Sequence, residues 1–132
     1  MIFIGIVLVS TFSMWAQERV YVSTDKDVYV AGEDIWYSVY CMEGDSGKYS
    51  GLSDVAYLQF VSNDGIAATH KVALIEGRGC GVFQIPVTFA TGNYSIVSYT
   101  KAYGGDAKNE FNGKIITVLN TVSAKRVREG VA

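Results

Sequence analysis

The chain lacks most of the residues from which catalytic and metal sites are built. Its 132 residues contain one histidine, His70, and two cysteines, Cys41 and Cys80. A catalytic zinc or a Ser-His-Asp arrangement needs several such side chains at suitable spacing, and none lies at ligand spacing from His70. We therefore predict a protein that is not an enzyme and that has no metal and no cofactor. His70 is interpreted as a strand residue near the surface.

An excess of positive charge is also absent. The chain has 11 Lys and Arg against 13 Asp and Glu, a formal net charge of −2. Nucleic-acid binding depends on neutralised phosphates, so no nucleic-acid partner is expected. Helical periodicity is missing as well, because no stretch after residue 17 keeps it for three turns. With a single proline, 14 glycines and nine tyrosines, the composition favours β-structure with many turns.

One long apolar run is present, at the N-terminus. Residues 1–16 carry no charge, end in the small residue Ala16 and precede the polar residues 17–19. The run is too short to span a bilayer comfortably and is typical of a signal peptide. We predict cleavage before Gln17 and export from the cytoplasm. The alternative is that the run forms an apolar first strand.

Alternating apolar residues predict seven or eight short strands in the rest of the chain. Asn63-Asp64-Gly65 is the strongest hairpin signal, since Asp-Gly readily adopts positive φ. The predicted fold is all-β, a fibronectin/immunoglobulin-like antiparallel β-sandwich. It forms one domain over residues 17–120, and residues 121–132 are a linker or a truncated continuation. The expected strands are Arg19–Ser23, Val28–Val30, Asp34–Met42, Asp54–Ser62, Ala67–Ile75, Gly79–Ile85, Tyr94–Thr100 and Lys114–Leu119.

The same alternation identifies the side chains that face the space between two sheets. We expect the core to contain Ile35, Tyr37, Val39, Leu58, Phe60, Val72, Leu74, Phe83, Ile85, Tyr94 and Ile96. Tyr94 follows Gly92 at the start of a late strand, which is where a tyrosine corner lies in a Greek-key sandwich.

The segment between residues 21 and 37 contains the most informative motif. Its Thr-Asp-Lys-x-x-Tyr-x-x-Gly-Glu pattern is formed by Thr24, Asp25, Lys26, Tyr29, Gly32 and Glu33. The motif resembles the opening of the second macroglobulin domain in the α2-macroglobulin family, although Asp27 and Val30-Ala31 replace that family's prolines and arginine. Three further stretches are similar: Asp64-Gly65, residues 76–86 and residues 92–96. The resemblance covers roughly residues 20–120.

This resemblance implies an exported bacterial module, located in the periplasm, in the outer membrane or at the cell surface. Such a module serves as a scaffold or interaction domain of a larger envelope protein, without the bait region and thioester of a protease inhibitor. Its partners are other domains of that protein or a separate protein. Membrane contact is expected only through a missing portion or a neighbouring protein. The motif itself is assigned a structural role, in which Asp25 and Glu33 accept hydrogen bonds from turn amides and Gly32 occupies a corner.

The cysteines suggest two further possibilities. Gly79-Cys80-Gly81 is similar to the family's thioester motif, but the position of the required glutamine is taken by Phe83, which excludes that chemistry. A Cys41–Cys80 disulfide is opposed by strand parity, which places the two thiols on opposite faces. A bulge at the flanking glycines would permit the bond, so both states stay open.

The acidic residues near the motif have two interpretations as well. Asp25, Asp27, Glu33 and Asp34 cluster around one turn, and such carboxylates either bind Ca²⁺ weakly or cap turns. We favour capping.

Exposed aromatic residues suggest the alternative function. Trp36 and Tyr40 face outward by parity, and Tyr49 lies in the following Gly-rich loop. Together they would form a surface for carbohydrate or peptide. The competing interpretation is that a loop or strand covers them.

Overall fold

The computed structural model describes residues 18–44, 46–101 and 113–127. These residues form eight strands, and none of them is helical. Every predicted strand is present, with ends that differ from the prediction by at most two residues. The strands are β1 (Glu18–Thr24), β2 (Val28–Val30), β3 (Asp34–Glu43), β4 (Val55–Ser62), β5 (Gly65–Ala73), β6 (Arg78–Gln84), β7 (Gly92–Thr100) and β8 (Lys114–Leu119).

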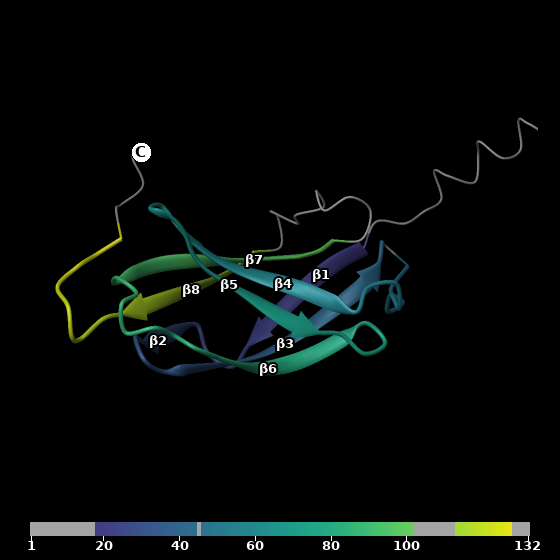
Figure 1. Ribbon diagram of the computed structural model, residues 1–132, viewed down its shortest axis with the longest axis horizontal. Helices are drawn as coiled ribbons and strands as arrows, with labels where there is room; N and C mark the ends of the chain where they lie inside the picture. Colours follow the sequence, from purple (N-terminus) through teal and green to yellow (C-terminus); the bar gives the residue numbers. More distant parts are fainter. Residues whose placement is uncertain (1–17, 45, 102–112, 128–132) are drawn as a thin grey trace, which may run out of the picture.

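The strands form two sheets that pack face to face, as Figure 1 shows. The smaller sheet has the order β1-β3-β6 and the larger one has the order β2-β8-β7-β4-β5. All pairs are antiparallel except β2 with β8, which is parallel. The predicted fibronectin/immunoglobulin-like β-sandwich is confirmed, and β2 with β8 is the one pair of described strands that departs from the antiparallel arrangement. The chain passes from the smaller to the larger sheet between β1 and β2. In the larger sheet β2 lies beside β8 and runs in the same direction as β8.

The core lies between the sheets and follows the predicted alternation. Ten of the eleven residues expected to face inward are buried, and Phe83 is half-buried against the same cluster. Phe60 lies at its centre, with its ring stacked on Phe83 at a centroid distance of 4.3 Å and in edge contact with Phe89 at 6.4 Å. The Tyr94 hydroxyl donates to the Ala90 carbonyl at 2.7 Å, so the predicted tyrosine corner is present.

The described part of the segment after β8 packs against the sandwich. Val127 is buried, and its amide donates to the Thr91 carbonyl at 2.7 Å. A Cβ added to Gly92 would meet the Val127 side chain at 2.6 Å, so a glycine is needed there for close approach. The Asn120 side chain fixes the start of this segment on the sandwich, because its amide donates to the carbonyls of Val87 and Phe89. The described structure thus continues to residue 127, within the segment 121–132 that we interpreted as a linker or a truncated continuation.

We expect Phe60→Ala to lower the free energy of unfolding by about 3–5 kcal/mol, because the change leaves a cavity among packed rings. The measurement is chemical denaturation. Ile115→Ala, at an exposed position of β8, is the control and should change stability by less than about 0.5 kcal/mol. A loss below about 1 kcal/mol for Phe60→Ala would contradict the register of β4.

Candidate functional site

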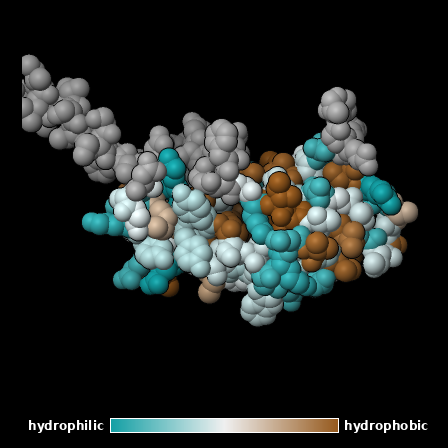
Figure 2. Space-filling model, turned by 180° about the vertical axis from the view of Figure 1, so that it is seen from behind, coloured by the Kyte–Doolittle hydropathy of each residue, from teal (hydrophilic) through white to brown (hydrophobic). Residues whose placement is uncertain are grey.

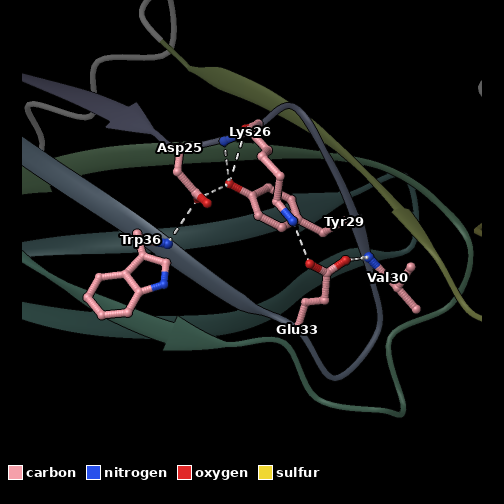
Figure 3. Close-up of polar contacts among 6 residues, drawn as sticks. All are labelled: Asp25, Lys26, Tyr29, Val30, Glu33 and Trp36. Atoms are coloured by element: carbon pink, nitrogen blue, oxygen red, sulfur yellow. Dashed lines mark hydrogen bonds and ion pairs between the residues drawn. The ribbon is translucent and has the colours of Figure 1, made fainter.

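The predicted motif occupies the point at which the chain changes sheets, shown in Figure 3. Tyr29 is fully buried, and its hydroxyl donates to Asp25 Oδ1 at 2.6 Å while accepting the Lys26 amide at 3.0 Å. The same Asp25 oxygen accepts the Trp36 amide at 3.1 Å, and the Asp25 amide donates to the Trp36 carbonyl at 3.0 Å. Asp25 therefore connects the turn after β1 to the start of β3.

Glu33 stabilises the second turn of the motif, between β2 and β3. Its Oε1 accepts the Val30 amide at 2.7 Å, and its Oε2 lies 2.5 Å from Lys26 Nζ. Gly32 has a φ of 97°, which a residue with a side chain adopts only with strain. The hydrogen bonds expected from turn amides to Asp25 and Glu33 are thus present.

Neighbouring amides in the same turn connect it to both sheets. The Ala31 amide donates to the Leu119 carbonyl of β8, and the Gly32 amide donates to the Ile85 carbonyl after β6, each at 2.9 Å. The turn therefore links the ends of strands from both layers.

The electrostatics of the motif follow from these contacts. The hydrogen bond from Tyr29 holds the pKa of Asp25 below its ordinary value. Burial, with the bond to Asp25 in addition, raises the pKa of Tyr29 to about 12. The bond from Lys26 lowers the pKa of Glu33. Since Lys26 and Glu33 are both exposed, their ion pair adds little to stability.

Substitutions in the motif should separate its buried contacts from its exposed ion pair. We expect Asp25→Ala and Gly32→Val to lower the Tm, because the first leaves turn amides without an acceptor and the second strains the backbone. Lys26→Ala is the matched control and should hardly change the Tm. Thermal melts followed by circular dichroism measure all three. Equal Tm values for the four proteins would show that the motif does not stabilise the fold.

A second polar cluster surrounds Glu18, which is buried at the start of β1. Its Oε2 accepts the Ser50 hydroxyl at 2.5 Å and the Cys41 thiol at 3.2 Å. Its Oε1 accepts the hydroxyls of Ser53 at 2.5 Å and Thr100 at 2.9 Å. The carboxylate therefore joins both sheets and the loop before β4, and no Lys or Arg among the described residues pairs with it.

This cluster was not expected from the sequence, because a charged residue at the start of a strand is ordinarily predicted to be exposed. Burial alone would raise the pKa of Glu18, but the hydrogen bonds from Ser50, Ser53, Cys41 and Thr100 outweigh it, and the net direction is downward. Burial and the neighbouring Glu18 raise the pKa of the Cys41 thiol to about 12, which keeps this cysteine protonated and unreactive.

We expect Glu18→Gln to lower the free energy of unfolding at pH 7 by about 1–3 kcal/mol, since an amide cannot accept all four donors. Because the pKa of Glu18 is lower in the folded than in the unfolded protein, its carboxylate stabilises the folded state fully at pH values above the unfolded pKa. That stability is lost as the pH falls through the folded pKa. The difference between the two proteins should therefore shrink below about pH 4, near the ordinary pKa of glutamate. Urea denaturation across a pH series measures it, and a difference independent of pH would contradict a charged Glu18.

The aromatic residues predicted to form one binding surface lie in two places on the outer face of the smaller sheet. Tyr40 and Tyr49 stack at a centroid distance of 6.4 Å with ring planes 28° apart. They border a groove of about 490 Å³, here called the tyrosine groove, which is lined by Tyr21, Tyr40, Met42, Gly44, Gly47 and Tyr49. Trp36 is 62% exposed and lines a separate groove with Cys80 and Ser38. Tyr21 and Met42 were not identified from the sequence, although both alternate out of phase with core residues.

The histidine and the cysteines lie apart from this groove. Both thiols are free, with Cys41 buried and Cys80 exposed, as parity between adjacent strands indicated. His70 is half-buried and accepts or donates a hydrogen bond with the Tyr37 hydroxyl at 2.8 Å. Its ring contacts those of Tyr37 and Phe83, and burial lowers its pKa. It is therefore a contact between the sheets rather than a surface residue.

The described residues contain neither a metal-ligand cluster nor a membrane-spanning helix. Within the ranges given above, no group of three or more His, Cys, Asp and Glu side chains is arranged to hold a metal ion. The same residues contain no helix of the length and apolarity needed to cross a membrane. Of the acidic residues around the turn, Asp25 and Glu33 accept hydrogen bonds from amides, and Asp27 lies 2.5 Å from Lys114 Nζ.

Comparisons with known proteins identify the fold. No family model matches the sequence, and no curated protein matches it. Among solved structures, trypsin-activated α2-macroglobulin from Escherichia coli superposes with a TM-score of 0.60 at 16% identity, over 80% of this chain and 7% of that protein. Salmonella α2-macroglobulin reacted with methylamine gives 0.61 at 15% identity, over 81% and 6%. The native conformation of the E. coli protein gives 0.59 at 16% identity, over 78% and 6%.

The chain has a macroglobulin-like fold. It spans less than a tenth of the length of these bacterial α2-macroglobulins.

Proposed function

We propose that the chain is a non-enzymatic interaction or scaffold module of an exported envelope protein of the α2-macroglobulin type. The observation that carries this proposal is the structural similarity to one part of the bacterial α2-macroglobulins. The superposition covers about four fifths of this chain and less than a tenth of each of those proteins. A domain of this kind contributes surfaces and spacing, while whole-protein activities require further domains. The apolar N-terminal run supports export, and the motif supports the second macroglobulin domain type.

The described polar groups support a structural role for the interior. The three carboxylates with lowered pKa, Glu18, Asp25 and Glu33, all accept hydrogen bonds that hold strands and turns. Perturbed carboxylates can mark catalytic sites, but here their oxygens are taken up by contacts within the fold: Glu18 accepts from hydroxyls and a thiol, Asp25 from Tyr29 and the Trp36 amide, and Glu33 from Lys26 and the Val30 amide. The chemistry of these groups is used to maintain the fold.

The described surface supports an interaction role. Outward-facing aromatic residues gather on the smaller sheet, and exposed aliphatic residues gather on β2 and β8 at the other end of the domain, among them Val28, Ile115 and Leu119. In Figure 2 apolar side chains concentrate in the right half of the visible face. Contiguous apolar areas on a small domain are typical of contact surfaces.

A protease assay tests the distinction between a module and an inhibitor. The full chain is incubated at equimolar ratio with trypsin and with elastase, and residual activity is measured on a protein substrate. We expect full residual activity, because a lone sandwich cannot enclose a protease. Stoichiometric inhibition that survives removal of excess chain would contradict the proposal and assign the inhibitory activity to this domain.

A further inference from the structure

Four strands form the borders of the two sheets, and three of them carry features that oppose pairing with another chain. On β1, the Val20 carbonyl accepts the Ser98 hydroxyl of β7 at 3.0 Å. β2 contains only three residues. β5 carries Lys71, and its pairing with β4 shifts register between Phe60 and Val61. Short strands, lysines and irregular pairing are means by which proteins prevent association edge to edge.

The fourth border strand, β6, has none of these features. It contains seven residues, pairs with β3 without a register shift, and carries neither charge nor proline from Gly79 to Gln84. It lies along the border of the smaller sheet (Figure 1), and no described strand pairs with its other side. An uncharged edge of this length is a template to which a further strand can be added.

The backbone groups of β6 alternate between its two sides. The Ile85 amide donates to the Glu33 carbonyl, so the odd-numbered residues of this part of the chain belong to the ladder with β3. The N–H and C=O groups of the even-numbered residues therefore point away from β3. Within residues 79–84 these groups belong to Cys80, Val82 and Gln84, and no described strand lies on that side.

The inward-facing residues of β6 favour a second copy of the same strand as the partner. Phe83 contacts the core cluster but stays half-buried, unlike the other residues expected in the core. Antiparallel pairing of two β6 strands about Val82 places Phe83 of one copy opposite Gly81 of the other. An aromatic side chain across from a glycine on a strand edge covers that glycine. The pairing would therefore cover the exposed part of Phe83 as well.

The outward-facing residues are complementary in the same register. Val82 is the register partner of Trp36, and the two residues are 37% and 62% exposed. A two-fold axis at Val82 places the two valines opposite each other, with one Trp36 on either side. The neighbouring pairs join Cys80 of one copy to Gln84 of the other, so no charged residue faces a like charge. One apolar row thus crosses the joined sheets.

We propose that the chain forms a two-fold dimer in which β6 pairs with β6 of a second copy, antiparallel and centred on Val82. The two smaller sheets then become one continuous sheet. This register uses both backbone groups of Cys80, Val82 and Gln84 on each copy, and the contact is self-complementary, as a two-fold interface requires. The inference rests on the proposed interaction role and names the surface and the partner.

Sedimentation equilibrium of the full chain over a concentration series, up to about 1 mM, tests the dimer. We expect the unmodified chain to dimerise and Val82→Lys to weaken association about tenfold or more, because two like charges then face each other at the axis. Ile115→Lys adds the same charge at an exposed position of β8 and is the matched control, which should associate like the unmodified chain. Circular dichroism melts check that each variant is folded.

Two further experiments test the register itself. Val82→Asp should also be monomeric, and mixing it with Val82→Lys should restore a dimer, because opposite charges then meet at the axis. In a Cys80→Ser background, Val82→Cys should form an intermolecular disulfide in air, since hydrogen-bonded antiparallel partners lie about 5.5 Å apart between Cα atoms. Ile115→Cys in the same background is the control and should not form one at equal concentration.

A chain that stays monomeric at about 1 mM would overturn the inference. Undiminished association of Val82→Lys would also overturn it, because the contact would then lie elsewhere on the chain. If the two charge variants do not associate on mixing, the proposed register is wrong. A chain that stays monomeric but binds an extended peptide along β6 would assign this edge to a different protein and reject the second copy. Each of these failures leaves the protease assay, and with it the proposed module role, unaffected.

Discussion

The hydrogen bond from the buried Tyr29 hydroxyl to Asp25 lies where the chain leaves the smaller sheet and enters the larger one, and it connects the two layers there. β1 pairs with β3, three residues form a turn, and β2 pairs with β8 in the other layer. A buried hydroxyl without a partner would be costly, and the Tyr29 hydroxyl is satisfied by Asp25 Oδ1 at 2.6 Å and by the carbonyl and amide of Lys26 at 3.1 and 3.0 Å. Asp25 in turn bonds the Trp36 amide, which makes the position of β3 depend on the same contact.

Polar chemistry inside the domain is directed to holding layers together. Glu18 accepts donors from β3, β7 and the loop before β4, and Asn120 holds the segment that returns to Thr91. These groups are satisfied by neutral donors or by backbone groups.

Strand positions and the core followed from the sequence because alternation is a local property. Phe60 and Ile96 identify their own face without knowledge of their neighbours. The pairing of strands is not a local property, and the features that depend on it were not predicted from the sequence. The parallel β2–β8 pair, the burial of Glu18 beneath Thr100 and the return of Val127 to Thr91 each join segments distant in sequence. The lining of the tyrosine groove shows the same limit. Tyr40 and Tyr49 were named from the sequence as exposed aromatic residues, whereas Tyr21 lies beside Tyr40 only because β1 pairs with β3 in this register.

The motif and the groove are connected through the phase of β3. Reciprocal hydrogen bonds between Asp25 and Trp36, with the added bond to the Asp25 side chain, set where β3 begins and which side Trp36 faces. Tyr40 lies four residues further along, an even number, so it shares the outer face with Trp36 while Val39 and Cys41 enter the core. A slip of one residue would exchange these sets, burying Tyr40 and exposing Cys41. The turn that changes sheets therefore also determines that Tyr40, with its register partner Tyr21, faces solvent towards the far end of the same strand.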